Sequence, residues 1–294
     1  MDAHTLDQWF ERAVDTIDRG DLPTLDRLLE EHPELVSRRL DAPGAWLRER
    51  VGGALDGFFK APYLLWFVAE DPVRQNRLPA NIVEVAGRII EAARRHARES
   101  LPDQLDQALR LVAWSGVAAR CGMQLALIDL LVEAGASPAA NANNALVNRH
   151  VAAAERLIQL GGRLTLAAAL CLDRWDEVPR LFAEANPGQR QFALVLAALN
   201  GTAAAVRWML AAGVSPNQPS ADLFSHGTPL HHAVCSGSLD TVQAFVEGGA
   251  DQTIADTAWN GTPLGWADHY VSSVEPERRS RYEEIARYLD SKRP

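Results

Sequence analysis

The sequence predicts an all-α protein: a solenoid of about eight helix-turn-helix repeats, several of which lack the hairpin loop, or finger, that joins neighbours. Two observations support this fold class. The phrase Gly-Thr-Pro-Leu-His-His-Ala at 227–233 returns as Gly-Thr-Pro-Leu-Gly-Trp-Ala at 261–267, 34 residues later. An apolar triplet typical of a second helix also recurs along the chain. Because one such unit cannot bury its apolar face alone, neighbouring units must stack on it.

The apolar triplets place second helices along nearly all of the 294 residues. Each triplet is a small or branched apolar residue followed by apolar residues three and four positions later, which share one helix face. The first members are Leu25, Ala86, Ile128, Ala154, Val178, Val206, Val242 and Ile285. Their uneven spacing predicts one solenoid over 1–294, with an elaborated second repeat at about 40–97 and a bare helical stack at about 140–191. The most regular repeats are expected at 217–290.

Each element of the repeat that begins at Gly227 has a local cause. Thr228 can cap the first helix with its hydroxyl, and Pro229 fits the first helical turn, where its missing N–H has no cost. Gly237 ends this helix, and Gly249 supplies a left-handed cap at the end of the second helix. These positions predict two helices separated by a tight turn.

The Thr-Pro-Leu-His-x-Ala turn, at a period of about 33 residues, resembles an ankyrin repeat. The residues at 228–233 and 262–267 carry this resemblance, which is weaker in the second repeat, where Ala61-Pro62-Tyr63-Leu64 replaces Thr-Pro-Leu-His. The resemblance implies a module that binds a protein or peptide in a concave groove formed by finger tips and first helices. It implies no cofactor and no covalent chemistry.

Composition excludes several classes of function. The net charge of −9 disfavours a nucleic-acid partner, whose phosphates need a basic surface. No apolar run is long enough to span a membrane, and the N-terminus shows no secretory signal. Cys121, Cys171 and Cys235 are scattered, which indicates reduced thiols in a cytoplasmic protein and no metal site. Abundant Ala and Arg with two lysines indicate a bacterial source, and the oligomeric state stays open.

The predicted binding site lies at the C-terminal fingers and on the first helices beside them. Its residues are Phe224, His226, His232, Cys235, Ser236, Trp259, Trp266 and Asp268. Apolar side chains at finger tips avoid water unless something covers them. Long fingers that bury their own aromatic side chains are the alternative. His231 is expected instead to have a structural role, with hydrogen bonds around the Thr-Pro turn.

A second group of aromatic residues lies in the elaborated second repeat. Asp56-Gly57 is typical of a turn, so Phe58, Phe59 and Lys60 are expected to project toward the groove as further binding residues. The alternative is that these aromatic side chains fill the core of an atypical repeat.

The sequence favours a binding protein over an enzyme without deciding between them. In the enzyme alternative, a small-molecule pocket lies between the second repeat and the C-terminal fingers. His226 or His232 would act as general acid or base there, and Asp268 would orient it. No nucleophile, phosphate-loop or metal-protease motif supports this alternative. A regulatory scaffold that masks its partner is a third possibility.

Overall fold

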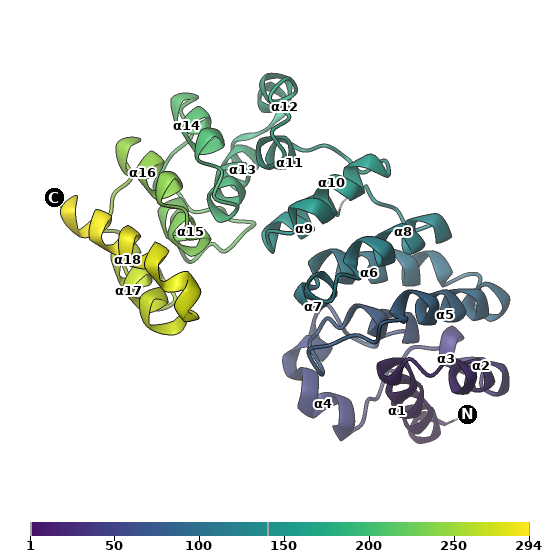
Figure 1. The fold of residues 1–294 in the computed structure, drawn as a ribbon. Helices are drawn as coiled ribbons and strands as arrows, with labels where there is room; N and C mark the ends of the chain where they lie inside the picture. Colours follow the sequence, from purple (N-terminus) through teal and green to yellow (C-terminus); the bar gives the residue numbers. More distant parts are fainter. Residues whose placement is uncertain (1, 140, 294) are drawn as a thin grey trace. The chain divides into compact units, whose positions relative to one another are not determined.

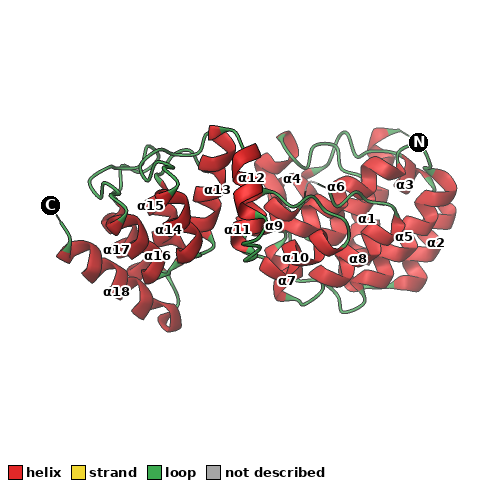
Figure 2. Ribbon diagram, turned by 90° about the horizontal axis from the view of Figure 1, so that it is seen from above, coloured by secondary structure: helices red, strands yellow, loops and turns green. Residues whose placement is uncertain are grey.

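The computed structural model describes residues 2–139 and 141–293, which form helices and no strand; a single isolated bridge joins Ser220 to Leu223. The prediction of an all-α fold is confirmed. Contacts divide the chain into two compact units, Met1–Arg163 and Leu164–Pro294, which are described separately (Figures 1 and 2). One solenoid over 1–294 stays a prediction. Met1, Pro294 and Ala140, where the predicted bare stack begins, lie outside the described residues.

Unit 1 contains four helix pairs in its described part. The first helices of these pairs stack on one another, and the second helices stack in the same order to form a second layer. The pairs are α1 Ala3–Arg19 with α2 Leu22–Glu31, η2 Leu64–Ala69 with α5 Ile82–His96, α6 Leu101–Trp114 with α8 Gln124–Ala134, and α9 Ala142–Val147 with α10 Val151–Gln159. Short helices in the connections are α3 Glu34–Ser37, α4 Ala45–Val51, η1 Gly52–Asp56 and α7 Gly116–Arg120.

The second pair departs most from a regular repeat. Its first helix, η2, is a 3-10 helix in which all six residues are buried. Apolar side chains around its whole circumference keep it in the core, and Glu70, in the left-handed region at φ 50°, ends it. The residues before η2 form α4, η1 and a loop rather than a simple finger.

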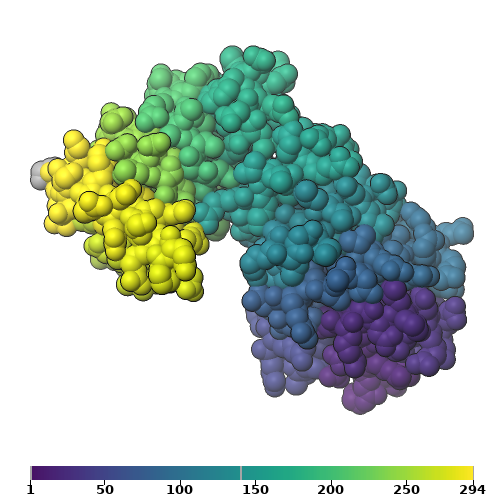
Figure 3. Space-filling model, in the orientation of Figure 1, coloured from purple at the N-terminus to yellow at the C-terminus, as the bar shows by residue number. Residues whose placement is uncertain are grey.

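Unit 2 contains four further pairs among its described residues. They are α11 Leu166–Cys171 with α12 Val178–Glu184, α13 Pro187–Leu199 with α14 Ala203–Ala211, α15 Pro229–Ser236 with α16 Leu239–Glu247, and α17 Pro263–Ser273 with α18 Pro276–Ser291. In the last pair, the long spacing seen in the sequence reflects helices of 11 and 16 residues rather than an inserted loop. Side chains of α17 and α18, in yellow, form one continuous surface (Figure 3).

Small side chains let the first helices of unit 2 stack closely. α11 packs on α13, and α13 packs on α15. Buried alanines lie along all three helices, and Cys171 is buried beside them in α11. Since an interior is packed to high density, an added methylene at such a position has no space to occupy.

The predicted caps are present. The hydroxyl of Thr228 and the side chain of His231 form a reciprocal capping box, and Gly237 ends α15 at φ 73°. Thr262 accepts a hydrogen bond from the backbone N–H of Gly265 at the start of α17. The repeated phrase therefore marks two helix starts, as the sequence predicts.

Leu157→Ala in α10 is expected to lower the free energy of unfolding by about 3 kcal/mol, as truncation of a buried leucine does. Leu157 is fully buried, whereas Leu181, at the matching position of α12, is half-buried, so Leu181→Ala should cost less. Urea unfolding of the two variants measures the difference. If Leu157→Ala unfolds at the same urea concentration as the parent, the assignment of Leu157 to the buried face of its repeat is wrong.

Candidate functional site

Aromatic rings from two fingers and two first helices meet in unit 2. We call Phe224, His226, His232, Trp259 and Trp266 the finger cluster. The ring of His226 lies at its centre, with its centroid 5.1 Å from that of Trp259 and 5.9 Å from that of Trp266. The two indole rings are 5.7 Å apart. The ring centroid of Phe224 lies 6.2 Å from that of His226.

Backbone hydrogen bonds hold the two fingers against each other. The N–H of Thr257, in the second finger, donates to the carbonyl of His226, in the first, at 2.8 Å. Within the second finger, the N–H of Asp256 donates to the carbonyl of Gly261 at 2.9 Å. The loops lie together at one edge of unit 2, beside α15 and α17 (Figure 2). The cluster therefore has a fixed frame rather than two independent loop tips.

His231 links the two repeated turns. Its Nδ1 accepts a hydrogen bond from the backbone N–H of Thr228 at 3.1 Å, and its Nε2 donates to the carbonyl of Gly261 at 3.0 Å. Because both ring nitrogens are engaged and the side chain is buried, His231 has the structural role that the sequence predicts.

Asp256 organises the second finger and was not predicted from the sequence. It is buried, and its carboxylate accepts hydrogen bonds from the N–H groups of Ala258, Trp259 and Gly261 at 2.7–2.8 Å and from Nε1 of Trp266 at 2.9 Å. Burial raises its pKa, but these hydrogen bonds prevail and hold the pKa well below its usual value. A Cβ at Gly261 would meet the Asp256 carboxylate at 3.1 Å, which favours glycine there.

The position of Asp256 relative to the repeated phrase is a signal that the sequence does contain. Asp256 stands five residues before Gly261, as Asp222 stands five residues before Gly227. Asp222 is exposed and Asp256 is buried, however, so the shared position alone does not identify the carboxylate that organises a finger.

The prediction that His232 faces the groove is wrong. Its side chain is buried because it lies beneath Phe224, and its Nε2 donates to the carbonyl of Phe224 at 3.2 Å. Burial lowers the pKa of His232 to about 4, so the ring is neutral at neutral pH. His232 therefore holds the first finger in place rather than meeting a ligand directly.

Cys235 and Ser236, also predicted as binding residues, are half-buried and engaged within the fold. The Tyr270 hydroxyl donates to Sγ of Cys235 at 3.2 Å, and the Ser236 hydroxyl donates to the carbonyl of Ala233 at 2.6 Å. Asp268 is exposed on α17. Within the described residues, no hydrogen bond joins Asp268 to His226 or His232, so the pair needed for the acid–base alternative is not formed.

The two tryptophans of the finger cluster border a hollow of about 430 Å³. Trp259 is 70% exposed and Phe224 is 41% exposed, while Trp266 is half-buried. The hollow is lined by Trp259, Gly261, Gly265, Trp266, His269 and Tyr270. Gly265, which replaces the structural histidine of the preceding repeat, leaves space beside Trp266.

The two phenylalanines of the second repeat have different environments. Phe58 is 54% exposed, as predicted for a side chain that leaves the core. The prediction that Phe59 projects toward the groove is wrong, because its ring is buried 5.2 Å from Phe67 and 6.0 Å from Trp66. The alternative that aromatic side chains fill the core describes Phe59.

Two absences hold for the described residues alone. Their His, Cys, Asp and Glu side chains form no group of three that could hold a metal ion. None of the described helices has the length and apolar character needed to cross a membrane.

The stacked helix pairs and linked fingers define a helical-repeat protein. A family model described as ankyrin repeats (3 copies) matches residues 150–256. Residues 150–256 are accordingly ankyrin repeats, in agreement with the resemblance carried by the turn at 228–233. It is also similar to the ankyrin repeat domain of human ASB11, at 17% sequence identity, over 64% of this chain and 85% of that one, with a TM-score of 0.34. No curated protein matches.

Proposed function

We propose that the finger cluster binds a protein partner through a peptide segment that places an apolar or aromatic side chain against Trp259 and Trp266. The exposure of Trp259 carries this proposal. A tryptophan at 70% exposure, held in place by Asp256 and His226, is apolar surface that a partner can cover without reorganising the loop. Ankyrin repeats commonly serve in protein interaction, which supports the same function.

Charge around the finger cluster favours a basic residue next to the apolar anchor. Asp222 is exposed on the first finger and Asp268 is exposed on α17, and the whole chain carries a net charge of −9. On α17, Asp268 is one helical turn after Gly265, which lines the hollow. An arginine or lysine of the peptide could also lie over an indole face.

A library of random peptides displayed on phage, selected against the full chain, tests the proposal. Enriched sequences are expected to carry an aromatic or aliphatic residue followed by a basic one. Selected peptides without such a pattern, or peptides whose binding does not depend on the finger cluster, would contradict it.

The variant Trp259→Ala with Phe224→Ala is expected to weaken binding of the selected peptides by about 1,000-fold, because two aromatic anchors that each contribute about 2 kcal/mol are removed together. The matched control is Leu125→Ala in α8, since Leu125 is 41% exposed, as Phe224 is. Fluorescence anisotropy with labelled peptides measures both affinities. Equal affinity for the parent and the double variant would place the site elsewhere.

A further inference from the structure

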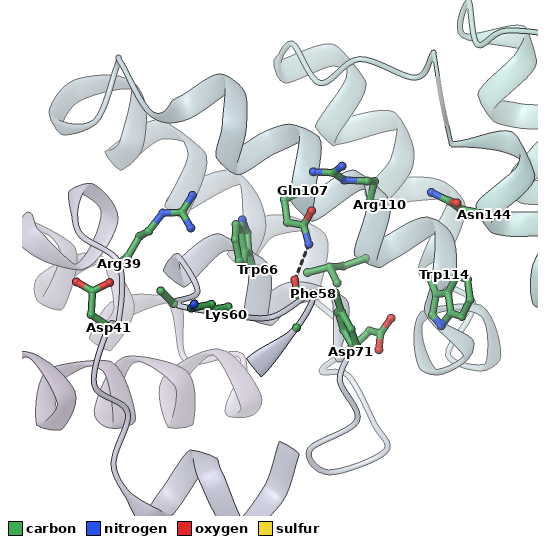
Figure 4. A pocket seen from close by; sticks show the side chains of 13 residues that line it. Arg39, Asp41, Phe58, Lys60, Trp66, Asp71, Gln107, Arg110, Trp114 and Asn144 are labelled. Atoms are coloured by element: carbon green, nitrogen blue, oxygen red, sulfur yellow. Dashed lines mark hydrogen bonds between the residues drawn. The ribbon is translucent and has the colours of Figure 1, made fainter. Parts of the chain in front are cut away.

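A second hollow, of about 890 Å³, lies within unit 1. It is lined by the loop after α3, the loop between η1 and η2, and one face of α6. Its charged and aromatic side chains include Arg39, Lys60, Arg110, Phe58, Trp66 and Trp114. Figure 4 shows Arg39 and Lys60 on one side, Arg110 on the other, and Trp66 and Phe58 between them. This volume is in the range of small-molecule sites.

The three basic side chains of this hollow have no carboxylate partner. Within the described part of the chain, Arg39, Lys60 and Arg110 form no ion pair, whereas Arg74, Arg88 and others do. These three cations outnumber the two carboxylates that also line the hollow, Asp41 and Asp71. In a protein with 38 acidic and 29 basic residues, this local excess of positive charge favours an anion.

The walls offer flat apolar surface that is held in place. Trp66 packs against Phe59 and Tyr63 on its buried side, and the guanidinium of Arg39 lies 5.4 Å from the Trp66 ring centroid. Phe58 is 54% exposed, but its carbonyl accepts a hydrogen bond from Nε2 of Gln107 at 2.8 Å, which fixes the loop.

One polar atom in this wall lacks a partner. Trp66 is 5% exposed, and its indole Nε1 is buried without a hydrogen-bond acceptor. Buried N–H groups normally have acceptors, so an orphan at a hollow points to an acceptor supplied from outside the chain. An anion can reach Nε1 only if neighbouring side chains move, and the half-buried Arg39, which lies over the same ring, is one of these neighbours.

We propose that this hollow binds a small anion that carries a flat ring, such as an aromatic carboxylate or a nucleoside phosphate. The anionic group lies between Arg39 and Lys60, one of its oxygens accepts from Nε1 of Trp66, and the ring packs against Phe58. Arg110 faces the hollow from α6 and adds to the positive potential. This site is separate from the finger cluster and does not depend on the peptide-binding proposal.

Asp71 limits the affinity of this site. It also lines the hollow, and burial together with the neighbouring charge of Glu70 raises its pKa to about 6. Its carboxylate is therefore largely ionised at neutral pH and repels an anion. Asp71→Asn keeps the size of the side chain and is expected to bind the anion more tightly than the parent.

Isothermal titration of the full chain tests the site with two pairs of probes: indole-3-acetate against indole-3-acetamide, and AMP against adenosine. At least one anion is expected to bind with a Kd of about 1 mM or below, as ligands of this size do at ordinary efficiency. Its neutral counterpart should bind at least about tenfold more weakly. Comparison of indole-3-acetate with AMP shows whether the site prefers a carboxylate or a phosphate.

Lys60→Gln and Phe58→Ala should each weaken binding of the anion by about tenfold, because one removes an ion partner and the other the ring contact. Both side chains are exposed, so the fold should persist. Arg27→Gln, an exposed cation on α2 outside the hollow, and Trp259→Ala in the finger cluster should bind as the parent does.

Three results of these titrations would overturn the proposal, and a fourth comes from inorganic phosphate. The three are no binding by either anion, equal binding of charged and neutral probes, and unchanged affinity in Lys60→Gln. Inorganic phosphate that binds as tightly as AMP would also refute it, because the aromatic wall would then contribute nothing.

Discussion

Arg74→Met is expected to lower the free energy of unfolding of unit 1 by about 3–5 kcal/mol, the usual cost of leaving one buried charge without its partner. The Arg74 and Glu70 side chains are fully buried and lie 2.8 Å apart, and Arg74 also contacts Asp18 at 2.8 Å. Its guanidinium donates a further hydrogen bond to the carbonyl of Phe67, at 3.2 Å. Methionine keeps much of the volume but leaves two carboxylates unpaired.

A matched surface pair separates this effect from the loss of any arginine. Arg88 is 48% exposed and pairs with Asp26 and Glu84 at 3.8 and 3.5 Å, so Arg88→Met should cost less than about 1 kcal/mol. Glu70 also accepts backbone N–H groups of Arg74, Gln75 and Asn76. Glu70→Gln can keep part of this role without the charge. The variant that combines Arg74→Met with Glu70→Gln should therefore lose less free energy of unfolding than the two single variants lose in sum.

Urea unfolding followed by far-UV circular dichroism measures these four variants and the parent. If Arg74→Met and Arg88→Met lose equal amounts of stability, the buried network does not stabilise the fold as the geometry indicates.

Asp256→Ala is expected to cost about 3–4 kcal/mol in unit 2, because it leaves up to four N–H donors without their shared acceptor. Asp268→Ala, which removes an exposed carboxylate from the neighbouring helix, should change stability by less than about 0.5 kcal/mol. Thermal unfolding of both variants at neutral pH measures the difference. Similar melting temperatures would show that the finger does not depend on Asp256.

Lowering the pH should remove part of the stability that Asp256 contributes to the parent protein. Hydrogen bonds hold the pKa of Asp256 below the ordinary value of 3.8, so the folded state binds its proton less readily than the unfolded state. The stabilisation is complete above the ordinary pKa and is lost as the pH falls from about 4 toward the lower folded pKa. Asp256→Asn should show a smaller loss of stability over this range than the parent.

Features that depend on near neighbours in sequence could be predicted. Thr228, His231 and Gly237 form the cap, the turn and the helix end through contacts within a few residues, so the repeated phrase is enough to identify them. The eight triplets likewise predict helix faces, because helical periodicity is a local property.

Features that depend on packing at a distance could not be predicted. Phe59 is buried because η2 replaces a regular first helix, and His232 is buried because Phe224 folds over it. Nothing near Glu70 in the sequence indicates a buried carboxylate, since Asp18, one of the members of its network, is 52 residues away. The exposed members of the finger cluster could be predicted, because the repeat pattern locates the finger tips in the sequence.

The close stacking of the first helices of unit 2 limits which substitutions their contact positions accept. Where α11, α13 and α15 meet, the close approach limits side-chain volume, so Ala, Ser and Cys can replace one another there more readily than any larger residue can. Cys171, whose thiol pKa burial raises to about 12, is one such exchange: a sulfur that fills space and stays inert. A bulkier residue would widen one gap and shift every later repeat with it. The spacing between repeats therefore tolerates exchanges among small residues at these positions and little else.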